Sequence, residues 1–342
     1  MNDTVTGQAL RDDADRALVD GVLAHKRRAL AKAITLVEST RADHQVRAQG
    51  LLEALLPHTG RSIRVGISGA PGAGKSTFIE ALGLHLIERG HKVAVLAVDP
   101  SSAISGGSIL GDKTRMERLS RSHDAFIRPS PSGGSLGGVA EKTREALLVC
   151  EAAGFDVIIV ETVGVGQSET AVAGMVDVFV LLQLPNAGDE LQGMKKGIVE
   201  LADIVAINKA DIDPKAAEFA RHQLRNALSL LRAASPDWRP PVVMVSALRH
   251  EGMDLLWGEI ERYRKIMVDS GEFEAKRRRQ AVDWMWTLID SGLRLHFRRH
   301  PHVRRHLDEI QRAVAQGSMT PAAAAYRLLG YLQKPSSENH HA

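Results

Sequence analysis

One segment constrains this chain more than any other: Gly69-Ala70-Pro71-Gly72-Ala73-Gly74-Lys75-Ser76. It follows the apolar run 63–67 and precedes a helical pattern that begins at Thr77. The spacing G-x-x-x-x-G-K-[ST] between a strand and a helix is typical of a phosphate-binding loop, in which glycines let backbone N–H groups surround an anion. We expect Lys75 to contact the β- and γ-phosphates and the Ser76 hydroxyl to bind Mg²⁺. Residues 69–77 are therefore predicted to bind a nucleoside triphosphate, and a glycine-rich turn without a ligand is the alternative.

The composition sets broad limits on the class of protein. The 342 residues allow about two domains, and a hydrophobic fraction of 44% is ordinary for a soluble globular chain. The formal net charge of +3 is too small to indicate nucleic-acid or membrane binding over the whole surface. The single cysteine, Cys150, excludes an internal disulfide and fits a reducing compartment. Because the first residues lack a signal-peptide pattern and no long apolar run occurs, we expect a cytoplasmic protein.

Strand and helix patterns alternate between residues 61 and 270. Seven apolar runs are expected to be strands: 63–68, 93–98, 125–128, 157–161, 176–184, 204–208 and 242–246. Helices are expected between them at 76–89, 138–153, 214–233 and 253–263. Most of the strand runs are continuously apolar, as in a parallel sheet that is covered on both faces. This order predicts an α/β fold with a doubly wound, mainly parallel sheet that binds its ligand at the carboxyl ends of the strands.

Helical patterns flank this alternation on both sides. Residues 11–37 and 40–56 are expected to form two helices, and a long helix followed by two short ones is expected after residue 271. The sequence therefore predicts an N-terminal helical extension (1–60), a nucleotide-binding domain (61–270) and a C-terminal helical arm (271–342). The apolar stripe of the long helix, 273–297, must be buried, either within the chain or in a homodimer.

Acidic residues near the phosphate-binding loop are candidates for a Mg²⁺ site, because this ion prefers oxygen ligands. Glu161 ends a predicted strand and begins Glu161-Thr162-Val163-Gly164, where the Gly164 N–H is the expected γ-phosphate contact. Asp99 follows the strand 93–98, so we expect a direct or water-mediated Mg²⁺ contact, with capping of the next segment as the alternative. Asp112 lies in the glycine-rich loop 106–115, which suits a switch that orders around metal and γ-phosphate. Gln167 is a candidate for orienting water.

The base-recognition residues are expected in two segments, Asn208-Lys209-Ala210-Asp211 and Ser246-Ala247-Leu248. The Asp211 carboxylate can accept hydrogen bonds from guanine N1–H and the 2-amino group, which adenine cannot supply, so GTP and GDP are favoured over adenine nucleotides. Asn208 is expected to hold this loop and contact N7, and the Lys209 stem is expected to lie along the base. A backbone N–H of residues 246–248 is expected to reach guanine O6.

Together these segments resemble the methylmalonyl-CoA mutase-associated GTPases, the MeaB/ArgK type of the P-loop metallochaperone-like G proteins. The resemblance runs from about residue 40 to residue 330, and the segments 106–116 and 188–197 carry it most specifically. It implies a P-loop GTPase domain in which Lys75, Ser76, Asp99, Asp112 and Glu161 form the phosphate and Mg²⁺ site. It also implies switches at 106–116 and 164–169 and a further switch at 185–197.

The resemblance further implies a C-terminal dimerisation arm and a partner. The partner is an adenosylcobalamin-dependent acyl-CoA mutase, with methylmalonyl-CoA mutase as the expected one. The chain would gate loading of the mutase cofactor and protect the loaded enzyme. The sequence identifies no arginine finger beyond the nearest candidate, Arg115, so intrinsic GTP hydrolysis is expected to be slow and to be accelerated by the partner.

Three other functions are alternatives for a chain with these motifs. A transport-linked kinase for basic amino acid uptake would need a phosphoacceptor, and no segment resembles one. A nickel or cobalt metallochaperone would need a Cys or His cluster. Cys150 lies in a helical pattern and is expected to be buried, and the histidines between 296 and 306 are expected to be surface residues. A scaffold with a degenerate nucleotide site conflicts with the complete set of motifs.

Overall fold

The computed structural model describes residues 12–98, 116–129, 136–162, 167–185, 196–230 and 235–333. The chain divides into two compact units, Met1–Glu274 and Ala275–Ala342. The first unit contains the sheet, its covering helices and the N-terminal helices, whereas the second is wholly helical in its described part.

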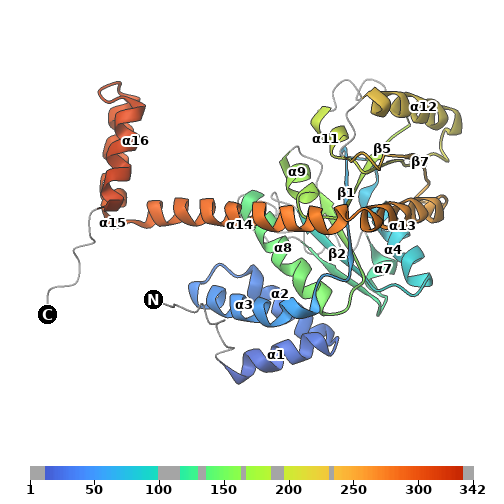
Figure 1. Cartoon of the computed structure of the whole chain (residues 1–342), viewed down its shortest axis with the longest axis horizontal. Helices are drawn as coiled ribbons and strands as arrows, with labels where there is room; N and C mark the ends of the chain where they lie inside the picture. Colours follow the sequence, from blue (N-terminus) through green and yellow to red (C-terminus); the bar gives the residue numbers. More distant parts are fainter. Residues whose placement is uncertain are drawn as a thin grey trace. The chain divides into compact units, whose positions relative to one another are not determined.

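A parallel sheet forms the centre of the first unit (Figure 1). In the described part of the chain it has seven strands in the order β3-β2-β4-β1-β5-β6-β7. The strands are β1 (Ile63–Gly69), β2 (Val93–Val98), β3 (Ala125–Arg128), β4 (Val157–Thr162), β5 (Val178–Gln183), β6 (Ile204–Ile207) and β7 (Val242–Met244). Every pair of neighbouring strands is parallel. The predicted doubly wound α/β sheet is confirmed, with ends that differ by a few residues from the predicted ones.

Helices cover both faces of the sheet because strand residues point alternately to opposite sides. In β6, Ile204 and Ala206 pack in one core with α4 (Lys75–Glu88), α7 (Glu117–Ser120) and α13 (Met253–Asp269). Val205 and Ile207 point the other way and pack with α12 (Pro214–Leu230). On that second face, α8 (Leu136–Ala152) and α9 (Gln167–Ala173) cover β2, β4 and β5, and the short α11 (Lys196–Glu200) precedes β6.

The N-terminal segment contains α1 (Asp13–Leu23), α2 (Arg27–Glu38), α3 (Ala42–Leu55) and a 3-10 turn, η1 (Leu56–His58). The prediction of one helix over 11–37 is wrong, because the chain turns at residues 24–26, where His25 has a φ of +57°. Apolar residues keep their helical spacing across this turn, so periodicity alone could not show it. The His25 Nδ1 atom lies 2.7 Å from the Ala153 carbonyl oxygen, which ties the turn to the end of α8. The three helices share one core with α8.

The C-terminal helices are α14 (Glu272–Arg299), which begins in the first unit, α15 (Pro301–Ala315), α16 (Pro321–Gly330) and the 3-10 turn η2 (Tyr331–Gln333). Pro301 lies at the first position of α15, where its missing N–H costs nothing. Val303, Ile310 and Leu328 form the centre of a small core in the second unit. Along α14, large apolar side chains such as Trp286 and Leu293 are exposed. Within the described ranges, none of the helices combines the length and hydrophobicity that a membrane crossing requires.

Candidate functional site

The phosphate-binding loop connects β1 to α4 at the carboxyl edge of the sheet, as predicted. Gly72 and Gly74 have φ values of +82° and +84°, in the left-handed region that favours glycine. A Cβ atom on Gly74 would lie 2.9 Å from Asn208 Nδ2, and one on Gly69 would lie 2.7 Å from the Leu182 carbonyl oxygen. The glycines are therefore needed both for the turn itself and for the close approach of neighbouring segments.

Lys75 begins α4, and its ammonium group lies against the loop. Its Nζ donates hydrogen bonds to the carbonyl oxygens of Gly69 at 2.7 Å and Ala70 at 3.2 Å. Burial lowers the pKa of Lys75, whereas the negative charges of Glu161 and Glu169 act in the opposite direction. A half-buried cation beside a turn of backbone N–H groups is a suitable environment for phosphate oxygens.

Two of the predicted Mg²⁺ ligands are brought together by the fold. The Ser76 hydroxyl donates a hydrogen bond of 3.2 Å to Glu161 Oε1. Glu161 lies near the end of β4, level with Ile67 of β1 and Ala97 of β2. A hydroxyl and a carboxylate are oxygen ligands of the kind that Mg²⁺ prefers, so these two residues fit the predicted site.

The other predicted residues of this region lie outside the described residues. These are Asp99, which follows β2 directly, and Asp112, Arg115 and Gly164. Gln167 begins α9, but its side chain is not among those that the structure describes. Their roles stay predictions.

The segment 208–211 holds the phosphate-binding loop and the second base-recognition segment together. Asn208 is 1% exposed; its Nδ2 donates to the Ala73 carbonyl oxygen at 2.8 Å and its Oδ1 accepts from the Ala247 N–H at 3.1 Å. Lys209 has a φ of +60°, and its Nζ donates to the Gly72 carbonyl oxygen at 3.0 Å. Asn208 thus connects the two segments, and the Ala247 N–H, one of the candidates for guanine O6, is bonded to Asn208.

Asp211, the predicted guanine-binding carboxylate, lies beside Ser246 and Arg249. A hydrogen bond from the Ser246 hydroxyl and, to a smaller extent, the positive charge of Arg249 lower the pKa of Asp211. Arg249 Nε lies 3.4 Å from Asp211 Oδ2. The Asp211 side chain is 8% exposed, whereas Leu248 is 79% exposed. An ionised carboxylate at this position can accept the two N–H groups of guanine.

Sequence reasoning gave no individual role to several residues of the site, although two of them lie in segments that it singled out. Glu169 on α9 is 2% exposed and is close enough to act on the Lys75 ammonium. Thr162 donates a hydrogen bond of 2.9 Å to the Ser68 hydroxyl, which joins the ends of β4 and β1. Arg249 follows the predicted 246–248 segment directly. The one available signal was proximity in sequence to a motif, since none of these contacts follows from spacing.

A transition-metal site finds no support in the described residues, where no group of three or more His, Cys, Asp or Glu side chains is placed to hold a metal ion. Cys150 is buried in α8, and burial raises the pKa of its thiol far above the usual range. The ring centroids of His300 and His302 are 5.8 Å apart, but His306 stacks on Tyr331 at 4.8 Å.

The chain is similar in sequence and structure to several known proteins. The family model described as "Methylmalonyl Co-A mutase-associated GTPase MeaB" matches residues 30–302. A protein of Caulobacter vibrioides described as a GTPase is 58% identical over 93% of this chain and 96% of its own length. The mouse "Methylmalonic aciduria type A homolog, mitochondrial" is 48% identical over 93% of this chain and 80% of its own length. A crystal structure described as a LAO/AO transport system kinase has 38% identity and a TM-score of 0.76, covering 95% of this chain and all of that one.

Proposed function

Because the chain belongs to the family of methylmalonyl-CoA mutase-associated GTPases, we propose that it is a nucleotide-dependent chaperone of a cobalamin-dependent acyl-CoA mutase. The chain is a GTPase, as its family and its relatives are. The finer proposal is that, in the cytoplasm, it gates adenosylcobalamin loading and protects the loaded enzyme. The 48% identity to the mouse methylmalonic aciduria type A homolog supports this proposal.

The observation that carries the nucleotide chemistry is the contact of Ser76 with Glu161 next to Lys75. In this proposal Ser76 and Glu161, with Asp99 and Asp112, would hold Mg²⁺, which would supply positive charge to the phosphates. Lys75 exchanges its bonds to the Gly69 and Ala70 carbonyls for phosphate oxygens, and the Gly164 N–H contacts the γ-phosphate. Residues 69–77 surround the phosphates with backbone N–H groups.

The base is held by the two loops that Asn208 connects. Asp211 accepts the guanine N1–H and 2-amino groups, and the Ser246 hydroxyl keeps its carboxylate ionised and oriented. Lys209 lies along the base, and an N–H of 246–248 contacts O6. Discrimination against adenine follows, because adenine offers neither of the two N–H donors that guanine presents to the Asp211 carboxylate.

The partner is proposed to sense the nucleotide through the segments 106–116, 164–169 and 185–197. Intrinsic hydrolysis is slow in this proposal, and the partner accelerates it by ordering these segments. The exposed apolar side chains of α14, among them Val282, Trp286 and Leu293, form a homodimer interface in this proposal, because such a surface is favourably removed from water.

The test is a pull-down of purified methylmalonyl-CoA mutase with this chain, loaded with GDP or with a non-hydrolysable GTP analogue. Binding that differs between the two nucleotides is expected, together with faster GTP turnover when the mutase is present. Asp211→Asn is the matched variant, since it should bind xanthine nucleotides in place of guanine nucleotides and restore the effect with them. Equal capture with both nucleotides and unchanged turnover would contradict the proposal.

A transport-linked kinase is the second candidate, because the similar crystal structure is described as a LAO/AO transport system kinase. The two functions differ in where the γ-phosphate goes. With γ-labelled GTP, a chaperone GTPase releases free phosphate, whereas a kinase leaves the label on a protein. Label on protein in stoichiometric amount would favour the kinase.

A further inference from the structure

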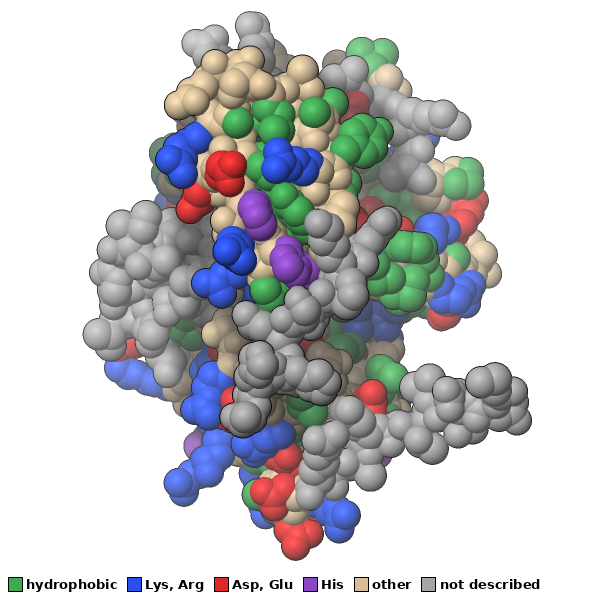
Figure 2. Space-filling model, turned by 90° about the vertical axis from the view of Figure 1, so that its left-hand side faces the viewer, with side chains coloured by type: hydrophobic (Ala, Val, Ile, Leu, Met, Phe, Trp, Pro, Cys, Tyr) green, Lys and Arg blue, Asp and Glu red, His purple; other side chains and the backbone are tan. Residues whose placement is uncertain are grey.

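A cavity of about 660 Å³ lies among α1, α2 and α3, and none of its lining residues belongs to the nucleotide site. This volume is within the range of small-molecule sites, about 300–1,000 Å³. Its apolar wall includes Leu18 of α1 and Ala29 and Leu36 of α2. In the lower part of Figure 2, exposed Lys and Arg side chains lie among some Asp and Glu side chains.

The polar lining of the cavity is almost entirely basic. Lys26, Arg28, Lys32 and Arg47 line it together with His44, and no carboxylate is among the described lining residues. Lys26, Arg28 and Lys32 form no ion pair with any residue in the described ranges. Because three of the basic side chains here have no ion-pair partner among the described residues, an anion would be bound favourably.

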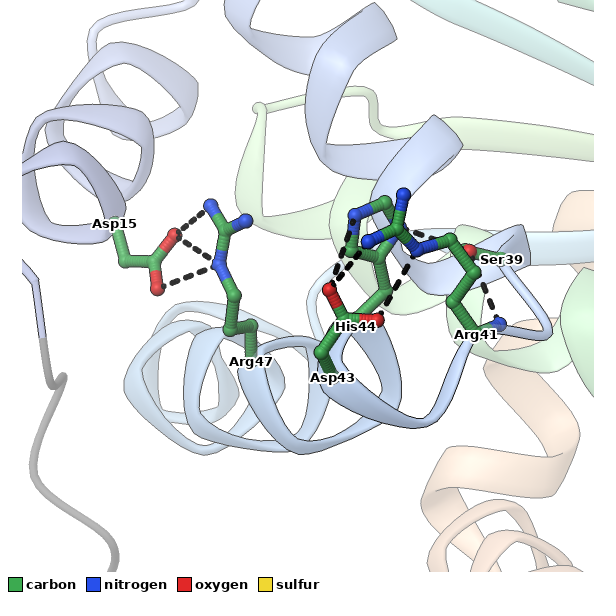
Figure 3. Close-up of polar contacts among 6 residues, drawn as sticks. All are labelled: Asp15, Ser39, Arg41, Asp43, His44 and Arg47. Carbon is green, nitrogen blue, oxygen red and sulfur yellow. Dashed lines mark hydrogen bonds and ion pairs between the residues drawn. The ribbon is translucent and has the colours of Figure 1, made fainter.

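Two of the polar side chains are held in place by neighbours (Figure 3). Arg47 donates from Nη2 to Asp15 Oδ1 at 2.7 Å and from Nε to both carboxylate oxygens, at 3.2 and 3.1 Å. Asp15 is 2% exposed, and this pairing leaves the Nη1 group of Arg47 for another acceptor. The His44 ring lies 2.9 Å from the Ser39 hydroxyl through Nδ1. Side chains that are already ordered lose less conformational entropy when a ligand binds.

The nearby acidic residues do not cancel this charge. Asp15 is paired with Arg47, and Asp43 is paired with Arg41 at 2.7 Å. The three remaining cations therefore give the cavity a net positive charge. Arginine is well suited to phosphate, because its planar group donates two parallel hydrogen bonds to two oxygens.

We propose that this cavity binds a small organic phosphate, with its phosphate oxygens on Arg28, Lys32 and Arg47 and its apolar part on Leu18 and Leu36. Arg28 and Lys32 of α2 and Arg47 of α3 line the same cavity of about 660 Å³ as the apolar side chains, and such a combination favours a compact ligand with an apolar part over a nucleic acid or a membrane surface. Such a ligand would contact α1, α2 and α3 at once and would reduce their local opening.

The test uses the full chain saturated with GDP and Mg²⁺, so that the phosphate-binding loop is already occupied. The probe is 1-naphthyl phosphate, followed by its fluorescence, and 1-naphthol is the probe without the phosphate. Binding of 1-naphthyl phosphate is expected, with hydrogen-exchange protection confined to residues 13–55 and with at least tenfold weaker binding of 1-naphthol, roughly the effect of losing charge-assisted hydrogen bonds.

The double variant Arg28→Gln/Lys32→Gln is expected to bind the probe about tenfold more weakly. Both residues are exposed, so the variant should fold. Lys215→Gln, an exposed lysine of α12, is the matched control and should bind normally. Unchanged affinity in the double variant, protection outside residues 13–55, or equal binding of 1-naphthol would overturn the proposal. So would binding to phosphatidylglycerol vesicles without binding of the soluble probe. None of these measurements uses GTP turnover, so a negative result for the cavity would not count against the proposed function.

Discussion

Asn208→Ala is expected to weaken the nucleotide site and the fold together. Asn208 connects the phosphate-binding loop to the base-recognition segment through its bonds to Ala73 and Ala247. All three residues are buried, with exposures of 1%, 1% and 4%. Alanine would therefore leave a buried carbonyl and a buried N–H without partners.

The size of the effect follows from these two bonds. A hydrogen bond contributes about 0.5–1.5 kcal/mol net, and an abandoned buried partner costs about 1–3 kcal/mol. Allowing for partial relaxation, we expect the free energy of unfolding to fall by about 2–4 kcal/mol. A loss of about 2 kcal/mol in the order of the two loops would weaken GDP binding about 30-fold.

The assay combines urea unfolding without nucleotide and calorimetric titration with GDP and Mg²⁺. Asn208→Asp is the informative second variant, because it keeps the acceptor for the Ala247 N–H but places a carboxylate oxygen against the Ala73 carbonyl. It should bind GDP at least as weakly as Asn208→Ala does. Asn226→Ala, at an exposed position of α12, is the matched control.

Asn208→Ala and Asn226→Ala could differ by less than about 0.5 kcal/mol both in the free energy of unfolding and in the free energy of GDP binding, which is the range of ordinary surface substitutions. That result would refute the role given to Asn208. An Asn208→Asp protein with normal GDP affinity would refute the specific role of the bond to Ala73.

Three further predictions concern the second face of the sheet. Gly154→Ala should lower the free energy of unfolding by about 1–3 kcal/mol. Gly154 has a φ of +79°, and a Cβ atom there would lie 2.5 Å from His25 Cε1, so adding His25→Ala should recover part of the loss. A Gly154→Ala protein with unchanged stability would contradict this. Burial by itself would raise the pKa of Glu151, but hydrogen bonds from Arg64 and from neighbouring groups have the larger combined effect. The pKa of Glu151 in the folded protein is therefore lowered. The ionised Glu151 carboxylate therefore stabilises the fold above its ordinary pKa of 4.5, and this stabilisation is lost as the pH falls through the lower folded pKa. Urea midpoints measured against pH should show this loss of stability, and the loss should be smaller in Glu151→Gln. Because burial raises the pKa of the Cys150 thiol, Ellman's reagent should react only after unfolding, and rapid reaction of the native protein would disprove this.

Some features of the site depend on residues that are neighbours in sequence, and these were predictable. The spacing from Gly69 to Ser76 specifies a strand, a tight turn and a helix N-terminus, all local conformations. Strand ends could likewise be placed, and parallel strands bring their carboxyl ends to one edge. For that reason Glu161 was expected near Ser76, and the two are in contact.

Other features join residues that are far apart in the chain. Asn208 bonds to Ala73 across 135 positions and to Ala247 across 39, and no pattern in either segment indicates the partner. The buried Glu169 near Lys75 and the pairing of Arg249 with Asp211 are of the same kind.

The sequence by itself determined the parallel α/β sheet, the phosphate-binding loop and the family, because each depends on local periodicity or on fixed spacing within a short segment. The tertiary structure alone decided the turn at His25, the basic cavity among α1, α2 and α3, and the bonds of Asn208. These arise where helices and loops from distant parts of the chain pack together, and such packing is fixed only when the whole core forms.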